Sequence, residues 1–297
     1  MSATLDTPKP AAPALPAAGL PAAPARTALA EPGRLGVHLR HAASVVLPLL
    51  VMLLLIGGVW ELAARLPGSS LPPPSKVWTT SNELILHPFY DRGGLDKGLF
   101  WHLLASLKRV AVGFTLSAVA GVALGMLVGT SSLAMRGLDP IFQVLRTVPP
   151  LAWLPLSLAA FRDAQPSAIF VIFITAIWPV IINTAVGVRN VPQDYRNVAR
   201  VIRLRGIPFF TKIILPSAAP YIFTGLRIGV GLSWLAIVAA EMLIGGVGIG
   251  FFIWDAWNSS NISDIIVALI YVGLVGFVLD RIIAVAGRLV TRGTAGA

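Results

Sequence analysis

The sequence predicts an all-α membrane protein with about six transmembrane helices, and three observations support this fold class. Hydrophobic residues make up 56% of the 297 residues and charged residues only 12%, at a mean hydropathy of +0.80, whereas soluble chains carry roughly 25% charged residues. Apolar runs of spanning length follow one another between residues 45 and 287. Lys and Arg gather in alternate connections between these runs, as in multi-span proteins.

The predicted spans divide the chain into a tail and a membrane domain. Residues 1–33 are rich in Ala and Pro with little apolar bulk, so we expect a disordered cytoplasmic tail. Because this tail precedes the first apolar run, we expect that run to be retained rather than cleaved as a signal peptide. The transmembrane permease domain is expected over 34–297, with spans at 45–66, 110–130, 138–160, 168–189, 220–243 and 265–287.

The stretch from 67 to 103 and the basic residues set the expected topology. The stretch opens with a Pro72-Pro73-Pro74 break and predicts an external loop with an interfacial helix. With six spans, most Lys and Arg outside the apolar runs fall on the same side of the membrane as the two termini. Because Lys and Arg are more frequent in cytoplasmic connections, both termini are expected to be cytoplasmic. Lys108 and Arg109 disagree, because they would sit at the outer edge of the second span; a shifted helix boundary would explain them.

Several classes of function are excluded or disfavoured by composition. The chain has no cysteine, which excludes disulfides, thiolate metal sites and iron–sulfur clusters. Its four histidines lie outside the predicted membrane cores, so haem ligation is not expected. The sequence contains no phosphate-binding loop of the Gly-x-x-x-x-Gly-Lys-Ser/Thr type. The net charge of +10 is typical of positive cytoplasmic loops and anionic lipid in so apolar a chain, not of nucleic-acid binding. We therefore expect no catalytic residue, metal site or cofactor in this chain.

The connection between the fourth and fifth spans, residues 190–219, has more structure than a charged loop requires. Asp194 is placed to cap a new helix. Apolar residues at helical spacing then form one stripe: Tyr195, Val198, Ala199 and Ile202. The pattern breaks at Gly206, and a second short apolar piece ends at Pro216. We predict two short helices on the membrane surface, which either bind anionic lipid or dock a cytoplasmic partner.

The same segment resembles a family motif. Asn197-Val198-Ala199, followed by Ile213, Leu215 and Pro216, is similar to the Glu-Ala-Ala loop of ABC-importer permeases, in which a Gly follows after three residues and Ile-x-Leu-Pro after nine more. Asn197 stands at the position of the Glu and Arg203 at that of the Gly; Gly206 is expected to supply the bend instead. The resemblance implies that an ATPase subunit docks on this segment, through Asp194, Tyr195, Asn197, Val198, Ala199, Ile202, Arg203, Gly206, Leu215 and Pro216.

Three longer stretches narrow the resemblance. Residues 138–153, 168–184 and 225–258 look like the nitrate-type permeases, a group that includes bicarbonate, cyanate, sulfonate and taurine permeases. The resemblance implies a type I importer subunit of the bacterial inner membrane that moves a small anion by alternating access, nitrate or nitrite first and the other anions as alternatives. It also implies a second copy of the chain, cytoplasmic ATPase subunits that bind ATP and Mg, and a periplasmic or lipid-anchored binding protein.

Polar and helix-breaking residues at membrane depth mark the expected translocation path, because lipid cannot satisfy freed backbone groups. The candidates, in chain order, are Arg146, Thr147, Pro150, Thr175, Trp178, Asn183, Arg227, Ser233 and Trp234. Each has a plainer alternative: a packing kink for the prolines, interhelical hydrogen bonding for the small polar residues, and an outward-reaching side chain for Arg227.

The remaining charged residues are interpreted as structural. Glu61 and Arg65 are spaced for a local ion pair, and Asp280 and Arg281, near the inner end of the last span, are expected to be structural. Glu241, near the outer end of the fifth span, would repel an anion and is given a structural or gating role. A membrane-embedded enzyme would need intramembrane His, Cys or paired carboxylates, and a passive channel would need no docking segment; both are therefore disfavoured.

Overall fold

The structure is a computed structural model that describes residues 34–291. It falls into two units, which divide after Ile56. The first unit contains the start of helix α1 (Arg34–Ala64), whose residues Val46–Ala64 are apolar and long enough to cross a membrane. The predicted tail, residues 1–33, lies outside the described residues.

All regular elements among residues 34–291 are helices, apart from an isolated bridge between Asp91 and Lys97. In this part of the chain five helices are long and apolar enough to span a membrane, and a bent pair of helices is a sixth candidate. These findings confirm the predicted all-α membrane protein with about six spans.

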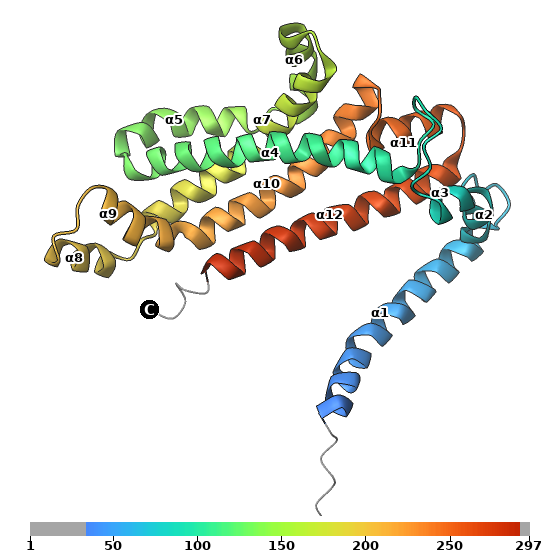
Figure 1. The fold of residues 1–297 in the computed structure, drawn as a ribbon, viewed down its shortest axis with the longest axis horizontal. Helices are drawn as coiled ribbons and strands as arrows, with labels where there is room; N and C mark the ends of the chain where they lie inside the picture. Colours follow the sequence, from blue (N-terminus) through green and yellow to red (C-terminus); the bar gives the residue numbers. More distant parts are fainter. Residues whose placement is uncertain (1–33, 292–297) are drawn as a thin grey trace, which may run out of the picture. The chain divides into compact units, whose positions relative to one another are not determined.

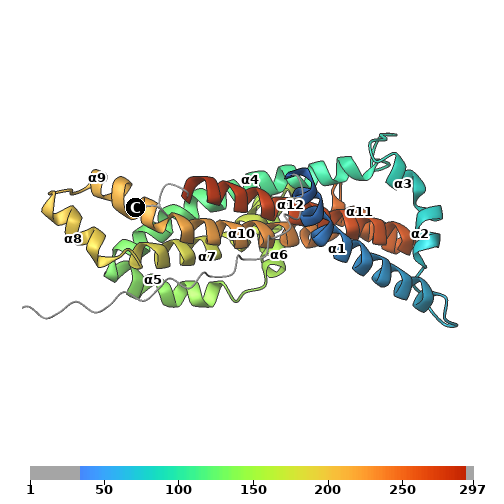
Figure 2. The ribbon, with the colours of Figure 1, turned by 90° about the horizontal axis from the view of Figure 1, so that it is seen from below.

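Four long helices of the second unit form a bundle (Figure 1). They are α4 (Leu99–Thr130), α7 (Ala164–Arg189), α10 (Leu215–Ile244) and α12 (Ile262–Thr291). Helix α10 runs opposite to the other three, and α7 packs against both α4 and α10 (Figures 1 and 2). The end of the bundle that carries helix α8 is called the α8 end below, and the opposite end, with α11, the α11 end.

Close packing of α4 on α7 depends on a stripe of small residues. At every fourth position α4 presents a residue with a small side chain or none: Gly113, Ser117, Gly121, Gly125 and Gly129. Residues four apart share one helix face, so α7 can approach the α4 backbone along this line. A Cβ added at Gly125 would lie 2.5 Å from the Cβ of Thr184, which leaves no room for a side chain. Ser117 adds a hydrogen bond from its Oγ to the carbonyl oxygen of Phe173 at 2.7 Å.

Helix α4 begins at Leu99, earlier than the predicted second span at 110–130. Lys108 and Arg109 therefore lie inside this helix, on the side of the α11 end, rather than just outside the membrane span. This earlier start is the shifted helix boundary that would explain the positions of Lys108 and Arg109 in the charge pattern.

The third predicted span is broken. Helix α5 (Ser132–Leu145) is followed by a 3-10 turn (Pro150–Ala152) and helix α6 (Trp153–Phe161). Pro149 and Pro150 cause the break, because proline lacks an N–H group and keeps the residue before it out of the helical conformation. The two halves make an angle of 88°, so 138–160 is not one straight helix but a bent pair (Figure 1).

The α11 end carries the short helices and much of the core. Helices α2 (Pro74–Thr80) and α3 (Asn82–Leu86) replace the single interfacial helix expected in the external loop, and both contact α12. Helix α11 (Ile249–Asn258) lies between α10 and α12 and was not predicted as a separate helix. The largest buried cluster lies here, with the fully buried side chains Leu99, Ile172, Ile237 and Ile249 at its centre.

The predicted ion pair between Glu61 and Arg65 is present. Arg65 Nη2 lies 2.6 Å from Glu61 Oε1, and the Ser75 hydroxyl donates to the same oxygen at 2.8 Å. The pair therefore ties the end of α1 to the start of α2, in addition to supporting its own helix turn.

Candidate functional site

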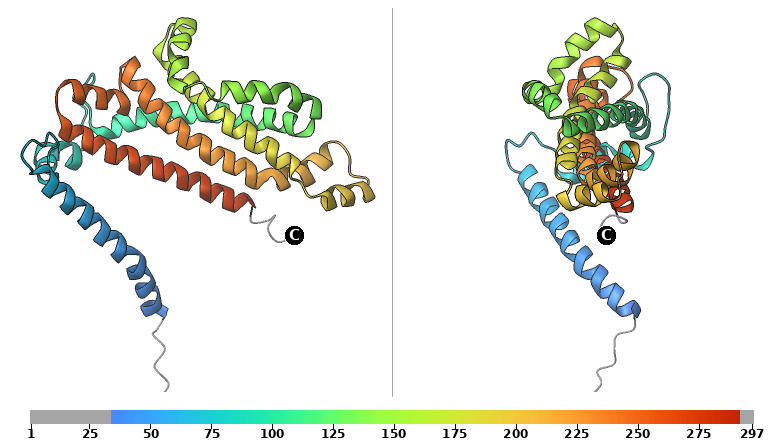
Figure 3. Two further views of the ribbon diagram at one scale, coloured as in Figure 1. Left: turned by 180° about the vertical axis from the view of Figure 1, so that it is seen from behind. Right: turned by 90° about the vertical axis from the view of Figure 1, so that its left-hand side faces the viewer.

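The predicted docking segment lies beyond the ends of α7 and α10, at the α8 end (Figures 1 and 3). It contains α8 (Gln193–Val201) and the single turn α9 (Ile207–Phe209). The expected capping by Asp194 is wrong: the N-cap residue is Pro192, and Asp194 lies in the first turn of α8 without a side-chain cap. Its negative charge still favours the helix, because the N-terminus of a helix carries partial positive charge.

The end of α8 explains why the family motif has a glycine where this chain has Arg203. Two hydrogen bonds close the helix, from Leu204 N–H to the carbonyl oxygen of Ala199 at 2.8 Å and from Arg203 N–H to that of Arg200 at 3.1 Å. This pair of bonds is the Schellman motif, which requires a left-handed residue after the helix. Arg203 adopts that conformation at φ 54°, and Gly206 makes a second left-handed turn at φ 58°.

This strain gives a testable stability prediction. Arg203→Gly is expected to stabilise the protein by about 0.5–1 kcal/mol, because glycine adopts the left-handed conformation without the steric cost of a Cβ. Thermal unfolding in detergent, followed by tryptophan fluorescence, measures the change. Arg205→Gly is the matched control: it removes the same charge at a residue without positive φ, and should lower the melting temperature. A decrease of equal size for both variants would contradict the assignment.

The apolar stripe on α8 divides between two faces. Tyr195, Val198 and Ile202 are exposed at 39%, 54% and 58%, but Ala199 is buried. Ala199 is buried because α8 contacts the helical turn that precedes α10. The prediction of one common face is therefore wrong for Ala199. Val201, on the exposed side, was missed and is 81% exposed. The docking face below means Tyr195, Val198, Val201 and Ile202.

The second half of the segment does not end at Pro216. A π-helical turn (Phe210–Ile214) passes without a break into α10, and Leu215 and Pro216 begin that helix. The apolar helical stretch therefore runs from Ile207 to Ile244, so the docking segment is a direct extension of a membrane span.

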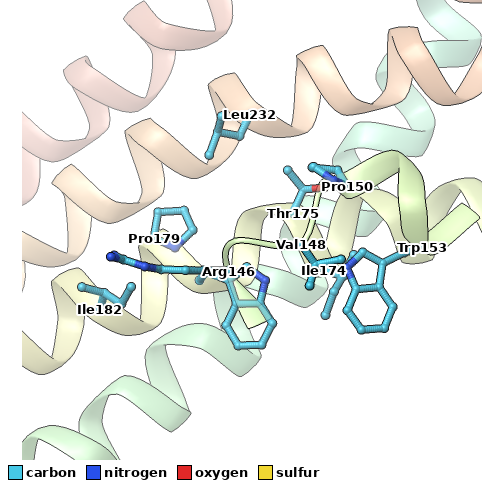
Figure 4. A pocket seen from close by; sticks show the side chains of 10 residues that line it. Arg146, Val148, Pro150, Trp153, Ile174, Thr175, Pro179, Ile182 and Leu232 are labelled. Carbon is cyan, nitrogen blue, oxygen red and sulfur yellow. The ribbon is translucent and has the colours of Figure 1, made fainter. Parts of the chain in front are cut away.

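A cavity of about 320 Å³ lies at the bend of the broken span. Arg146, Val148, Pro150 and Trp153 line it from the broken span, and α7 and α10 supply the other residues: Ile174, Thr175, Trp178, Pro179, Ile182 and Leu232 (Figure 4). Arg146 is the charged side chain among these lining residues, and it extends along α7 towards Ile182 (Figure 4). The cavity thus combines one cation with mostly apolar walls.

The cavity brings together four of the predicted path residues: Arg146, Pro150, Thr175 and Trp178. The Thr175 hydroxyl donates to the carbonyl oxygen of Val171 at 2.6 Å, so its hydrogen is used within its own helix. Thr147 lies next to Arg146 but outside the cavity lining, and its hydroxyl donates to the carbonyl oxygen of Val144.

The other four path candidates lie elsewhere. The Asn183 amide donates to the carbonyl oxygen of Pro179 at 2.8 Å, and Gly225 of α10 packs against the same two residues. Arg227 forms a two-pronged ion pair with Asp280 of α12. The geometry favours interhelical packing for Asn183, whereas Arg227 forms an ion pair between helices, which neither of its two predicted roles included.

Ser233 and Trp234 are also buried between helices. The Trp234 indole donates to the carbonyl oxygen of Val272 at 2.9 Å, which joins α10 to α12. Ser233 is fully buried and its hydroxyl has no hydrogen-bond partner among the described residues. Neither residue reaches the cavity.

A buried polar network at the α11 end was not predicted. Arg109 of α4 and Glu241 of α10 form an ion pair at 2.6 Å, with exposed fractions of 8% and 0%. The second carboxylate oxygen of Glu241 accepts hydrogen bonds from the Ser106 hydroxyl at 2.7 Å and from the Gly250 N–H at 3.0 Å. The carboxylate is therefore fully satisfied without water.

The network also holds the loop between α10 and α11. Arg109 donates further to the Gln165 side chain at 2.8 Å and to the carbonyl oxygen of Val247 at 2.9 Å. A Cβ at Gly248 would lie 2.5 Å from the carboxyl carbon of Glu241, so only glycine fits beside the pair. The arrangement joins α4, α7, α10 and the loop, and neutralises the Arg109 charge that disagreed with the predicted topology.

A sequence signal for this pair exists. Glu241 is a single charge within an apolar run and Arg109 stands beside Lys108 at the start of another; unpaired charges are costly in a membrane interior, so such residues need a partner of opposite sign. The predicted start of the second span at 110 placed Arg109 at the outer edge of the span, where a charge needs no buried partner.

Comparison with known proteins now decides the family. Residues 121–292 match the model of the family described as "Binding-protein-dependent transport system inner membrane component". The chain belongs to this family. It is therefore an inner membrane permease component, and the predicted membrane location is confirmed.

Relatives within the permease family carry three kinds of name. The nitrate import permease protein NrtB of Synechocystis sp. is 62% identical over 84% of this chain and 90% of its own length. The bicarbonate transport system permease protein CmpB of the same organism is 56% identical over 79% of this chain and 85% of its own length. The putative aliphatic sulfonates transport permease protein SsuC of Bacillus subtilis is 34% identical over 92% of this chain and 94% of its own length.

Solved structures support the permease fold. An inward-facing structure of the MetNI methionine ABC transporter covers 65% of this chain and 96% of its own, with a TM-score of 0.59 and 16% identity. The likeness confirms the predicted type I ABC-importer permease architecture.

Proposed function

We propose that this chain is the permease subunit of an ATP-driven importer that carries a small oxyanion, nitrate or nitrite first, into the cytoplasm. The observation that carries the proposal is the cavity at the bend of the broken span, where Arg146 is the charged lining residue. A guanidinium attracts an anion and offers several N–H donors. The apolar walls supply few further contacts, which suits a site that must release its ion.

The polar groups of the lining favour nitrate over bicarbonate. Arg and Trp side chains only donate hydrogen bonds, and the lining holds Arg146, Trp153 and Trp178 but no carboxylate, with the Thr175 hydroxyl as the one side-chain acceptor among the lining residues. Nitrate only accepts hydrogen bonds, whereas bicarbonate also has an O–H that needs an acceptor. NrtB of Synechocystis sp. is more similar to this chain than CmpB of the same organism, whereas NrtB of Synechococcus elongatus, at 53% identity, is not. Bicarbonate is the second candidate; sulfonate, taurine and cyanate follow.

Membership of the permease family supports a proposed assembly with partner subunits. Two copies of this chain would bind two ATPase subunits on their docking faces, and a periplasmic or lipid-anchored binding protein at the α11 ends. ATP and Mg would be bound by the ATPase, and this chain would have no catalytic role. Closure of the ATPases would move α8, and the continuous helix from Ile207 would carry the motion past the cavity, giving alternating access.

Arg146→Ala tests the function and the cavity together. The variant is expected to lose about 10- to 100-fold in nitrate uptake, because hydrogen bonds to a charged group contribute about 1.5–3 kcal/mol. Uptake is measured in vesicles that contain the permease, its ATPase and the binding protein, with nitrite, bicarbonate and taurine as competitors of labelled nitrate.

Asn183→Ala is the matched control, because its amide is used within α7 outside the cavity. Uptake by this variant should stay within about twofold of wild type. Unchanged uptake after Arg146→Ala would reject the cavity as the path. Competition by bicarbonate that exceeds competition by unlabelled nitrate would reject the nitrate assignment and favour the second candidate.

A further inference from the structure

A second, basic groove lies between α10 and α12, on their halves nearer the α8 end. Its volume is about 400 Å³, and its lining includes Phe223, Arg227, Arg281, Gly287 and Arg288. Gly287 forms part of the floor: a Cβ there would lie 3.1 Å from the Cβ of Phe223, so α12 rests directly on that ring. The groove is separate from the Arg146 cavity and shares no residue with it.

The charges in the groove are only partly compensated. Arg227 is neutralised by its ion pair with Asp280. The Arg281 guanidinium stacks over the ring of Phe277, with 4.8 Å between its central carbon and the ring centroid, which leaves its charge in place. Arg288 has no hydrogen-bond or ion-pair partner in residues 34–291. No Asp or Glu lines the groove itself. Asp280, beside it, pairs with Arg227 and also attracts Arg281, so three guanidinium groups face one carboxylate and a net positive charge remains to hold an anion.

The depth of these arginines matches the phosphate layer of a membrane. Asp264 lies in the first turn of α12 at the α11 end. A hydrocarbon core of about 30 Å corresponds to about 20 helical residues, and counting from Ile265 places its far boundary near Ala284. Arg281 and Arg288 fall on either side of this boundary, on the side that the Lys and Arg distribution predicts to be cytoplasmic.

One face of α12 carries apolar side chains within the hydrocarbon core and cationic side chains at the cytoplasmic boundary of that core. Leu274, Phe277, Arg281 and Arg288 recur at helical spacing on a single face. Leu274 and Phe277 are exposed at 58% and 57%, and both arginines are exposed as well. An acyl chain along the two apolar side chains would bring its headgroup phosphate to the arginines.

We infer that this groove binds the phosphate of an anionic phospholipid from the cytoplasmic leaflet. A phosphodiester accepts charge-assisted hydrogen bonds from guanidinium groups, and basic pockets between membrane helices on the cytoplasmic side hold lipid headgroups in this way. Arg227 lines the groove, and its ion pair with Asp280 joins α10 to α12 beside it.

Native mass spectrometry of the permease–ATPase complex tests the inference. The complex is exchanged into detergent with equal amounts of phosphatidylglycerol and phosphatidylcholine, and retained lipid is counted. Wild type is expected to retain phosphatidylglycerol at least about tenfold over phosphatidylcholine, and Arg281→Gln/Arg288→Gln to lose this preference. Arg281→Lys/Arg288→Lys keeps both charges and should retain much of it, which separates loss of the site from loss of folding.

A matched single pair completes the design. Arg288→Gln should lower retention, whereas Arg136→Gln, which removes an exposed arginine of α5, should not. Equal retention of the two lipids by wild type would overturn the inference, as would equal losses in both single variants. Displacement of the lipid by excess inorganic phosphate would overturn the phospholipid assignment. Cross-linking at position 288 to a second copy of the chain would also overturn it, because that copy would then occupy the groove. The readout needs no transport, so it is independent of the proposed function.

Discussion

Glu241→Ala is expected to destabilise the protein by about 3–5 kcal/mol, because it leaves the buried Arg109 charged and without its partner. The loss also leaves the buried Gly250 N–H without its acceptor, whereas the Ser106 hydroxyl can still donate to the carbonyl oxygen of His102. A lower yield of folded protein in the membrane and a melting temperature reduced by about 10 °C should result. Size-exclusion chromatography and thermal unfolding in detergent measure both effects.

A double-mutant cycle isolates the ion pair from the loss of packing. Arg109→Ala, Glu241→Ala and the double variant are compared, and the double variant should be less damaged than the sum of the two by at least about 2 kcal/mol. Glu61→Ala is the control for an exposed ion pair, with an expected effect of about 1 kcal/mol or less. Simple additivity of Arg109→Ala and Glu241→Ala would show that the two side chains do not stabilise each other.

Val198→Asp/Ile202→Asp is expected to abolish transport while the permease still inserts and folds. Both side chains are more than half exposed, so charge is tolerated in the free subunit. In the complex each carboxylate would be buried against the ATPase without a partner, at a cost of several kcal/mol. Co-purification of the ATPase should fall by at least about tenfold, and nitrate-stimulated ATP hydrolysis should be lost.

Two controls bracket this result. Gln193→Asp places the same charge on α8 outside the docking face and should leave co-purification unchanged. Val198→Thr/Ile202→Thr keeps the approximate shape without a charge and should retain partial activity. Normal coupling of ATP hydrolysis to uptake in the double Asp variant would remove the docking face from the ATPase interface.

The sequence predicts the helices well because membrane spans are local: a run of apolar residues is sufficient. Helix α4 shows the limit. Its true start could not be read from the run, because Arg109 is a charge whose partner, Glu241, lies 132 residues away. Likewise Pro149 and Pro150 predict a break, but the 88° angle depends on how α6 packs on α7.

The candidate site shows the same division between local and distant information. The cavity gathers Arg146 and Trp178, which share the region around the proline break. Asn183 and Trp234 have the same polar character, yet each donates to a backbone carbonyl, one on its own helix and one on α12. Residue type at membrane depth therefore identifies groups that need a partner, and only the tertiary structure shows which partner they have.

The unbroken helix from Ile207 to Ile244 has a mechanical consequence. Its 38 residues extend about 57 Å at 1.5 Å per residue, from the docking segment to the Glu241 network. Near its middle, Gly225 and Gly229 pack closely on α7, with the carbonyl oxygens of Pro179 and Ala176 among their nearest atoms. The helix can therefore rotate as a rigid body about its close contact with α7 at Gly225 and Gly229. In an assembly of two copies, a movement that brings the docking ends together would move the Glu241 ends apart. One helix could in this way open the outer side of the path while it closes the inner side.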